Sequence, residues 1–263
     1  MRILCFFLLT LLSGCSSISP GHFSLSTNGD KNKLTIGDTL FFSLSNPKEH
    51  SLNDLRFSLN GRPIDDQYTI IESLGNQRLV ADFKAGDKLF SVREQFVVFA
   101  NKAPDIYTYK LLNTYPHDKN AYTQGLEFYQ GMLYESTGQY GLSSIRKTEF
   151  ATGEVIQKFP LDASYFGEGL TFINDEAVQL TWKENLGFIY DPNNFKLLRS
   201  FNYEKSKEGW GLCNDGAVVY KTDGTEKLWK LDPATFTENG YVDIVTHNKL
   251  ISKVNELEYA NGL

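Results

Sequence analysis

Tyr165-Phe166-Gly167-Glu168-Gly169-Leu170-Thr171 places a single carboxylate between two glycines, with an aromatic residue before it and an apolar strand pattern after it. Related segments recur at 124–128, 208–212 and 255–259. Gly125 and Gly169 are 44 residues apart, and Gly169 and Gly209 are 40 apart. A period of about 40 to 45 residues in units rich in strand formers is typical of a propeller blade. The sequence therefore predicts a repeat in which the segment around Glu168 is an exposed turn.

A second set of turn signals supports the same period. The clusters Glu149-Phe150-Ala151-Thr152-Gly153, Asp191-Pro192-Asn193-Asn194 and Asp232-Pro233-Ala234-Thr235 begin 42 and 41 residues apart. Each cluster lies between two strand patterns, and Pro, Gly, Asn and Asp clusters of this kind are strong turn signals. Each unit is thus predicted to contain four antiparallel strands, which is the content of one propeller blade.

The repeat region is assigned to residues 104–263. Three units are predicted to be complete between Gln124 and Tyr241, and a fourth begins at Asn255. Since a propeller has about four blades at the least, we expect the sequence to be a fragment of a longer product. The alternative is that a partner chain or the N-terminal strand completes the ring.

Residues 23–103 contain short alternating strand patterns and no helical periodicity over a useful length. A pair of strands is expected around Gly37-Asp38. Leu55, Phe57 and Leu59 alternate into Asn60-Gly61, a dipeptide that favours a tight hairpin because both residues tolerate positive φ. The pattern predicts a small immunoglobulin-like β-sandwich, acting as a spacer or docking module.

The N-terminus has the features of a bacterial lipoprotein signal. Arg2 gives residues 1–14 a positive start, an apolar stretch follows, and Leu12-Ser13-Gly14-Cys15 resembles the lipobox. The apolar stretch is shorter than the ~20 residues of a membrane-spanning helix. We expect Cys15 to carry a lipid anchor and residues 15–22 to form a leash, so that the protein is membrane-anchored and extracytoplasmic, in the periplasm or on the cell surface. The alternative is a plain cysteine of the signal segment.

The composition argues against several classes of function. Apolar residues make up 41% of the chain, which is ample for a core, and 26 basic against 32 acidic residues give a net charge of −6. Without a run of Lys and Arg, the chain is not expected to bind nucleic acid. The four histidines lack metal-ligand spacing, and no phosphate loop or nucleophile elbow is visible. No metal or other cofactor is therefore expected.

Six segments carry a likeness to a known family. They are Tyr115-Pro116-His117-Asp118, Ala121-Tyr122-Thr123-Gln124-Gly125-Leu126, Phe166-Gly167-Glu168-Gly169-Leu170, Glu208-Gly209-Trp210-Gly211-Leu212, Thr222-Asp223-Gly224-Thr225 with Leu231-Asp232-Pro233, and Asn255-Glu256-Leu257-Glu258. In their order and spacing, from about Tyr107 to Leu263, they resemble the plant and bacterial type of glutamine cyclotransferase, or glutaminyl-peptide cyclotransferase.

The resemblance implies a fold and an activity. The family is a five-bladed β-propeller that converts N-terminal glutamine of peptides or proteins to pyroglutamate with loss of ammonia. The expected fold is therefore all-β, with an N-terminal immunoglobulin-like β-sandwich followed by an incomplete five-bladed β-propeller.

The resemblance also implies a site. Glu168 matches the family's acid/base carboxylate, and Gln124 and Asn255 match the amides that hold the substrate. In the family a further pocket tryptophan follows the last of these segments and a later blade supplies a lysine; both are absent here, so the chain alone is expected to form an incomplete pocket. The aromatic residues that match the pocket wall are Tyr122, Phe166, Trp182 and Trp210.

These residue types suit the reaction. The substrate's own α-amine attacks its side-chain amide, so one carboxylate within reach of both nitrogens can take the proton and return it. Aromatic walls exclude water and raise the pKa of that carboxylate, because its charged form loses solvation. Uncharged amides such as Gln124 and Asn255 can donate to the developing oxyanion.

Plainer interpretations stay open. Glu168 is also typical of a solvated turn, and Glu208 occupies the corresponding place in the next unit. Gln124 and Asn255 could cap turns, and the tryptophans could pack the blades. A non-catalytic propeller binding module on the cell surface is the alternative function, whereas a propeller hydrolase would need converging metal ligands that the sequence lacks.

Overall fold

The chain folds almost entirely into β-strands. The structure, a computed structural model, describes residues 18–30, 33–65 and 68–262. Within these ranges it contains twenty strands and two short 3₁₀ helices, η1 (Pro20–His22) and η2 (Asn28–Asp30). The all-β prediction is confirmed. The predicted signal segment 1–14 and Cys15 lie outside the described residues.

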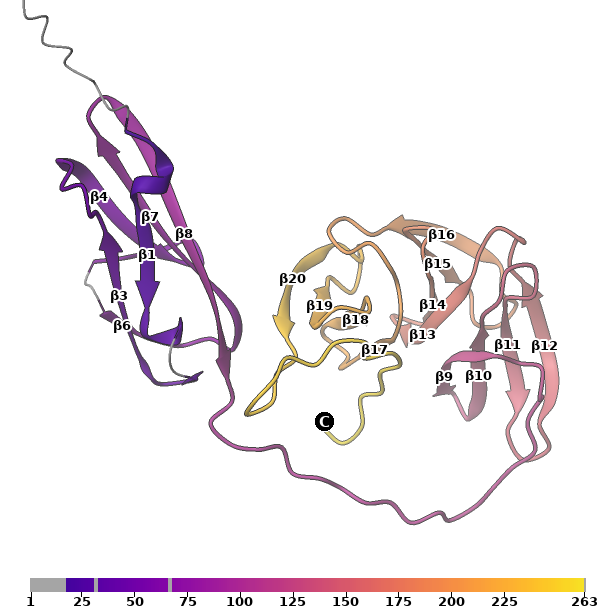
Figure 1. The fold of residues 1–263 in the computed structure, drawn as a ribbon. Coiled ribbons are helices and arrows are strands. Elements are labelled where there is room, and N and C mark those ends of the chain that lie inside the picture. The colour runs from indigo at the N-terminus through magenta and orange to yellow at the C-terminus, as the bar shows by residue number, and fades with distance from the viewer. Residues whose placement is uncertain (1–17, 31–32, 66–67, 263) are drawn as a thin grey trace, which may run out of the picture. The chain divides into compact units, whose positions relative to one another are not determined.

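The chain divides into two compact units (Figure 1). The first comprises the residues up to Ile71 together with Asn76–Val97, and the second comprises Glu72–Gly75 together with Val98–Leu263. The assignment of 23–103 and 104–263 to two functional domains stays a prediction.

The first unit contains two sheets. One has the strand order β1-β3-β6, and the other has the order β2-β8-β7-β4-β5. The strands are β1 (Ser24–Thr27), β2 (Leu34–Thr35), β3 (Thr39–Ser45), β4 (Leu52–Leu59), β5 (Arg62–Ile64), β6 (Tyr68–Ile70), β7 (Gly75–Ala85) and β8 (Lys88–Phe99).

Aromatic side chains from both sheets meet in the core of the first unit. Alternate residues of β7 are buried, as expected for a strand with one face on a core. The ring of Phe42 on β3 lies 5.0 Å from that of Phe57 on β4. Phe23 lies 4.7 Å from Phe83 and 5.2 Å from Phe90, measured between ring centroids. The two sheets therefore share one apolar core.

The structure places strands on both sides of Asn60-Gly61 and of Gly37-Asp38, as predicted, but only the first of these two dipeptides closes a hairpin. Asn60 and Gly61 have φ of 52° and 81° and join β4 to β5 as a two-residue hairpin. Gly37-Asp38 does lie between β2 and β3, but β3 pairs with β1 and β6, whereas β2 lies beside β8. That turn carries the chain from one sheet to the other instead of closing a hairpin.

The second unit contains three four-stranded antiparallel sheets in succession, each ordered as the chain runs. Strand β13 contacts both β9 and β17, and Figure 1 shows these first strands innermost and the fourth strands outermost. The strands are β9 (Thr123–Tyr129), β10 (Met132–Thr137), β11 (Ser144–Glu149), β12 (Glu154–Pro160), β13 (Gly167–Ile173), β14 (Glu176–Thr181), β15 (Leu186–Tyr190), β16 (Leu197–Asn202), β17 (Leu212–Asn214), β18 (Val219–Thr222), β19 (Lys227–Leu231) and β20 (Glu238–Asp243).

The three predicted turn clusters are confirmed between the third and fourth strands of each sheet. Gly153 N donates to Glu149 O at 2.8 Å between β11 and β12. Phe195 N donates to Asp191 O at 2.9 Å in the second sheet, and Phe236 N donates to Asp232 O at 2.8 Å in the third. The same backbone bond thus closes the same turn in all three sheets.

Glycines allow the inner strands to approach one another. A Cβ on Gly125 would lie 2.5 Å from the backbone N of Leu170, and one on Gly169 would lie 2.5 Å from the carbonyl O of Trp210. A Cβ on Gly211 would lie 2.8 Å from Cα of Glu256. Because any side chain here would push neighbouring backbones apart, the glycine recurs before or in the first strand of all three sheets.

These close approaches correct the alignment of the repeats. They match Gly169 with Gly211, so the prediction that Gly209 is its counterpart was wrong by two residues. Glu208 consequently corresponds to Phe166 and not to Glu168. The residues immediately before the aligned glycines are Gln124, Glu168 and Trp210, and Asn255 holds the matching place in the fourth repeat. We call these four residues the inner row.

Two apolar cores join neighbouring sheets of this unit. One combines Tyr134 and Ile145 of the first sheet with Phe172 of the second. The other combines Leu180 of the second sheet with Trp229 of the third. The inner row therefore stands on a packed scaffold.

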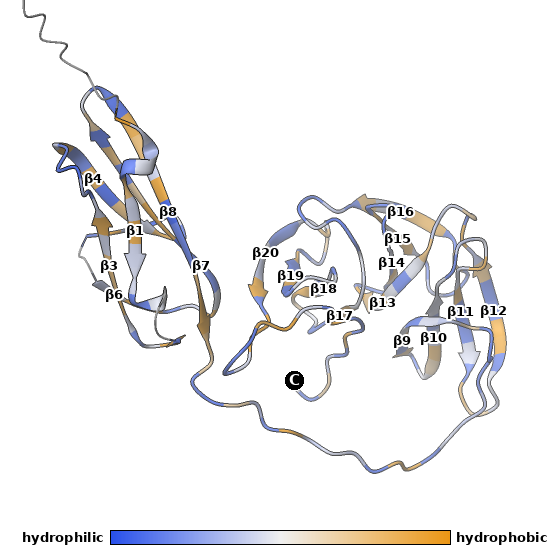
Figure 2. Cartoon of the chain, in the orientation of Figure 1, coloured by the Kyte–Doolittle hydropathy of each residue, from blue (hydrophilic) through white to orange (hydrophobic). Residues whose placement is uncertain are grey.

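Two segments of this unit lie outside the named strands. Residues 100–122 connect β8 to β9, and apolar residues are spread along them (Figure 2); Ile106 and Tyr109 are each 92% exposed. Residues 244–262 follow β20 and contain an isolated bridge between Val245 and Leu250. Among the described residues, no helix has the length and apolarity to cross a membrane.

Candidate active site

Glu168 is the second residue of β13, and only 6% of it is exposed. Gly167 pairs with Thr181 and Leu170 pairs with Gln179, so β13 holds one extra residue at this point. This is a β-bulge, a feature that re-aims side chains and is frequent beside active sites. The predicted exposed turn was therefore wrong. The carboxyl belongs to an inner strand that packs between its neighbours.

Burial dominates the electrostatics of Glu168. Loss of hydration raises the pKa of its carboxyl to about 8, and the negative charges of Glu208 and Glu184 contribute further. Within the part of the chain that the structure describes, neither a hydrogen bond nor a cation lowers this pKa. The group can consequently gain or lose a proton near neutral pH.

Gln124 occupies the equivalent bulge on β9. Gly125 pairs with Ser136 and Thr123 pairs with Thr137, so Gln124 is the extra residue. A Cβ on Gly138 would meet Cγ of Gln124 at 3.1 Å, and it would also collide with the ring of Phe166. The structure thus brings two predicted site residues, Gln124 and Phe166, to the same glycine.

Trp210 and Asn255 complete the inner row through backbone contacts. The carbonyl O of Trp210 accepts a hydrogen bond from Gly169 N at 2.8 Å. The carbonyl O of Asn255 accepts one from Thr222 Oγ1 at 2.8 Å, while the residue as a whole is exposed. Four successive repeats therefore contribute a glutamine, a glutamate, a tryptophan and an asparagine at matching places of the repeat.

Aromatic rings gather around Phe166, two residues before Glu168. The centroid of its ring lies 6.1 Å from that of Tyr122, 5.5 Å from that of Tyr140 and 5.5 Å from that of Trp182, each in an edge-to-face arrangement. Such pairs are the favoured geometry of packed aromatic side chains. The structure therefore brings together three of the four predicted wall residues.

The fourth, Trp210, joins the wall through a carboxylate. Nε1 of Trp182 donates to Oε2 of Glu208 at 2.9 Å, and Nε1 of Trp210 donates to the same oxygen at 2.8 Å. On the other side of the wall, the hydroxyl of Tyr140 donates to Oε1 of Glu184 at 2.8 Å. Two acidic side chains thus hold two of the three rings around Phe166, those of Tyr140 and Trp182.

Sequence reasoning missed these supporting residues. Tyr140 and Glu184 lie on connections between strands, where no periodic pattern marks them. Glu208 carried a signal, its place before Gly209-Trp210-Gly211, but it was interpreted as a counterpart of Glu168. The corrected alignment with Phe166 would have placed it in the wall.

The arrangement is suited to proton transfer. Glu168 carries a carboxyl with a pKa of about 8, two residues after Phe166 and in the same inner row as Gln124 and Asn255, and such a group can accept a proton and return it. In the described ranges, no three His, Cys, Asp or Glu side chains are grouped so as to hold a metal ion.

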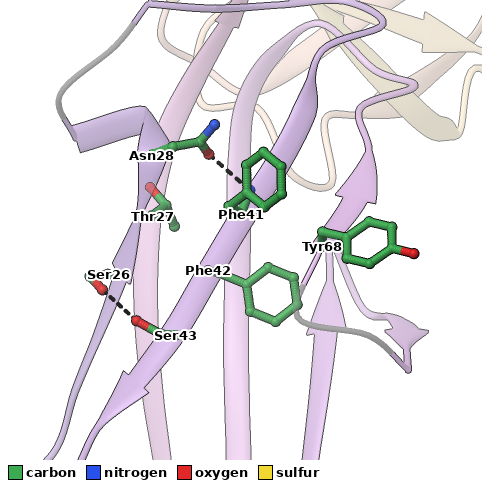
Figure 3. A pocket seen from close by; sticks show the side chains of 7 residues that line it. All are labelled: Ser26, Thr27, Asn28, Phe41, Phe42, Ser43 and Tyr68. Atoms are coloured by element: carbon green, nitrogen blue, oxygen red, sulfur yellow. Dashed lines mark hydrogen bonds between the residues drawn. The ribbon is translucent and has the colours of Figure 1, made fainter.

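A pocket in the first unit does not offer comparable chemistry. It has a volume of about 450 Å³ and is lined by residues of β1, η2, β3 and β6 (Figure 3). Asn28 is occupied with the backbone, accepting from Phe41 N at 2.9 Å and donating to Thr39 O at 3.0 Å, and the hydroxyls of Ser26 and Ser43 bond each other at 2.9 Å. The lining residues include neither a carboxylate nor a histidine, lysine, arginine or cysteine side chain.

Comparison with known proteins points to one family. The family model described as Glutamine cyclotransferase matches residues 88–263. The chain is 41% identical over 150 residues to the glutaminyl-peptide cyclotransferase of Arabidopsis thaliana, a match that covers 56% of this chain and 46% of the plant protein. The chain thus spans about half the length of this curated relative.

A solved structure gives the same answer. The crystal structure of Myxococcus xanthus glutaminyl cyclase superposes with a TM-score of 0.54 at 33% identity, covering 58% of this chain and 64% of that chain. The family model extends over more than half of the 263 residues. The chain belongs to the glutamine cyclotransferase family.

Proposed function

We propose that this protein cyclises the N-terminal glutamine of peptides or proteins to pyroglutamate and releases ammonia. Membership of the family and the likeness to the Arabidopsis and Myxococcus proteins support the reaction class. The observation that carries the proposal is Glu168, a buried carboxyl with a pKa of about 8 beside an aromatic wall. It is the acid/base group that the reaction requires.

The reaction needs little beyond proton transfer and positioning. The α-amine nitrogen attacks the side-chain amide carbon, and a C–N bond forms. Glu168 takes the proton that the attacking nitrogen loses and delivers it to the amide nitrogen. The bond from the carbon to that nitrogen then breaks, and ammonia leaves.

The pKa of Glu168 suits this exchange. An N-terminal α-amine has a pKa of about 7.7 to 8.0, close to the value of about 8 for Glu168. At a pH where the amine is neutral enough to attack, Glu168 is therefore present in both protonation states, and a pKa near the operating pH is the condition under which general acid–base catalysis works best. A carboxyl with an ordinary pKa would be a weaker base for the attacking nitrogen, and near neutral pH it would seldom carry the proton that the departing nitrogen needs.

The other predicted residues hold the substrate. Gln124 and Asn255 stand in the inner row on either side of Glu168 and Trp210, and their amides donate to the carbonyl oxygen as it gains charge. Tyr122, Phe166, Trp182 and Trp210 exclude water and confine the flexible glutamine side chain to its folded conformer.

The proposal includes a finer description of the fold. The three successive four-stranded sheets are blades of a five-bladed β-propeller, and the segment from Asn255 belongs to a fourth blade. Support comes from the common strand order, the repeated turns and the contact of β13 with both β9 and β17. The two sheets of the first unit form an immunoglobulin-like β-sandwich.

The proposed location follows from the N-terminal sequence. Residues 1–14 act as a lipoprotein signal, Cys15 is lipidated, and the protein works outside the cytoplasm, in the periplasm or on the cell surface. Metabolic labelling with a fatty-acid analogue tests this: label should enter the parent and be absent from Cys15→Ser.

Ammonia release from a glutamine-initiated peptide tests the function. The protein should release ammonia and yield a product with a pyroglutamyl N-terminus by mass spectrometry. Glu168→Gln should lower kcat by about 10²- to 10⁴-fold, because it removes the general acid and base. Glu154→Gln on the exposed start of β12 is the matched control and should keep full activity.

The outcomes separate the two readings of the protein. Full activity in Glu168→Gln would refute the acid/base role. Absence of any turnover in the parent, together with saturable binding of the same peptide, would favour a binding module.

A further inference from the structure

One oxygen of Glu208 accepts hydrogen bonds from two tryptophans that lie next to strands of different sheets. Trp182 follows β14 of the second sheet, and Trp210 precedes β17 of the third. Their indole N–H groups donate to Oε2 of Glu208 at 2.9 and 2.8 Å. A charged acceptor makes such bonds shorter and stronger than neutral ones. The carboxylate of Glu208 therefore links Trp182 to Trp210.

The hydrogen bond between Glu208 and Trp182 also affects the segment that leads into β13, because Trp182 packs against Phe166. The ring of Trp182 lies edge-on to Phe166 at 5.5 Å, and Phe166 stands two residues before Glu168. A free indole at this half-buried place could turn about its χ angles and release the Phe166 ring. With its N–H bound, the indole has one orientation.

We propose that Glu208 is a positioning residue of this site, holding Trp182 and Trp210 as one rigid wall and placing a negative charge within electrostatic reach of Glu168. This inference deepens the proposed function and rests on it. Glu208 does not touch the reacting atoms; it acts through the two indoles and through its charge.

The backbone of Glu208 is itself anchored from the interior. Its carbonyl O accepts a hydrogen bond from Nζ of Lys221 at 2.9 Å, and the next residue, Gly209, donates its N–H to the carbonyl O of Trp182 at 2.9 Å. Lys221 is fully buried and lies 3.5 Å from Oε1 of Glu238. The connection between β16 and β17 is thus fixed at the point where its carboxylate emerges.

The charge of Glu208 acts on Glu168 as well. After burial, it is the largest cause of the raised pKa of Glu168, followed by the charge of Glu184. Removing it should lower that pKa, so that Glu168 becomes a weaker base and carries a proton less often near neutral pH. Glu168 also interacts electrostatically with Glu256 on the segment after β20, with Tyr140 between β10 and β11, and with Tyr203 between β16 and β17.

The three tryptophans of the chain allow a direct test. Trp182 and Trp210 donate to Glu208, whereas Nε1 of Trp229 donates to Oδ2 of Asp223 at 2.7 Å. In ¹⁵N-labelled protein, Glu208→Gln should move the indole resonances of Trp182 and Trp210 upfield and leave that of Trp229 in place. Asp223→Asn should do the reverse. Glu204→Gln, on an exposed residue of the same connection, should move none.

A carboxyl ¹³C titration measures how the charge of Glu208 affects the pKa of Glu168. In Glu208→Gln the pKa of Glu168 should fall by about one pH unit, since one nearby like charge is lost. Glu208→Asp keeps the charge but shortens the reach, so it should release the indoles and leave the pKa of Glu168 nearly unchanged. If Glu208→Gln moves neither indole resonance nor the pKa of Glu168, the inference is wrong.

Kinetics separate this inference from the proposed function. With turnover, Glu208→Gln should shift the acidic limb of kcat/KM to lower pH by the same amount as the titration, whereas Glu208→Asp should raise KM without that shift. Without turnover in the parent, the proposed function fails, but the resonances and the titration still decide the role of Glu208. An unshifted acidic limb in an active Glu208→Gln variant would overturn the electrostatic part.

Discussion

Two glutamates of the second unit are buried to a similar degree and differ in almost everything else. Glu168 is 6% exposed and Glu238 is 1% exposed. Burial raises the pKa of Glu168 to about 8, with no hydrogen bond or cation among the described residues to oppose it. Glu238 instead accepts hydrogen bonds from Lys205 N at 2.6 Å and Ser206 N at 3.0 Å, and a short one from Ser206 Oγ.

The surroundings of Glu238 reverse the effect of burial on its pKa. Burial by itself raises the pKa of this carboxyl. Hydrogen bonds from Ser206 and Lys205 outweigh it, with the charge of Lys221 as a smaller contribution, and hold the pKa below its ordinary value. Burial also lowers the pKa of Lys221 to about 8, against the attraction of Glu238 and Asp223.

The difference distinguishes a structural charge from a functional one. A buried carboxylate that is fully paired holds the fold together, and its loss leaves a charge without a partner. A buried carboxyl without such partners costs stability when it ionises, and it persists where that perturbed pKa serves a function. Mutations at the two sites should therefore change stability in opposite directions.

The largest effect is expected from Glu238→Gln. It leaves Lys221 buried without its nearest counter-charge and should lower the free energy of unfolding by about 3 to 5 kcal/mol at pH 6. The folded pKa of Lys221 is already lowered, so the lysine can lose its proton as the pH rises. The loss should consequently shrink above about pH 8, which urea denaturation at pH 6 and pH 9 would measure.

A matched control for this prediction is Glu176→Gln, which breaks a partly exposed pair with Arg199. Exposed pairs contribute little, so this variant should lose less than about 1 kcal/mol. Equal losses of stability in Glu238→Gln and Glu176→Gln would show that burial does not determine how much each ion pair contributes.

The second effect has the opposite sign. The pKa of Glu168 rises from 4.5 to about 8 on folding, so the native state binds more protons than the unfolded state in that window. The stability that this group contributes is present below about pH 4.5 and is lost as the pH rises to about 8. Glu168→Gln should therefore equal the parent at pH 4.5 and exceed it by roughly 2 to 3 kcal/mol at pH 7.

Denaturation of both proteins across this pH range measures the gain, with Glu154→Gln as the exposed control. A difference between Glu168→Gln and the parent that does not vary with pH would contradict the raised pKa. A loss of stability at pH 7 would place Glu168 with Glu238 among the structural charges.

Some features of the fold and of the site around Glu168 could be predicted from the sequence, and others could not. The repeat period, the turns at Asp191 and Asp232 and the Asn60-Gly61 hairpin were predictable, because each depends on residues close together in the chain. Glu168 and Gln124 were predictable as site residues only through the family resemblance, and their roles stay a prediction. Local pattern sufficed for elements and not for the site.

What the sequence could not reveal depends on contacts between sheets. Gly209 and Gly211 fit the glycine spacing almost equally well, and only the packing of Gly211 against the segment at Glu256 decides between them. The burial of Glu168 follows from a bulge whose register is set by β14. The sharing of Glu208 by two indoles joins residues 26 and 2 positions away in the chain, a pairing that no local signal announces.

The smallest effect is expected at Glu184, and it tests whether the two neighbouring charges raise the pKa of Glu168 by different amounts. Glu184 contributes less than Glu208 to the raised pKa of Glu168, and its carboxylate is engaged by the hydroxyl of Tyr140 at 2.8 Å. Glu184→Gln should lower the pKa of Glu168 by less than Glu208→Gln does, a shift below about one pH unit. Tyr140→Phe removes the hydrogen bond and keeps the charge, so it should leave the pKa of Glu168 nearly unchanged. Carboxyl ¹³C titration of the three variants measures the order, and a larger fall in Glu184→Gln than in Glu208→Gln would reverse the ranking of the two charges.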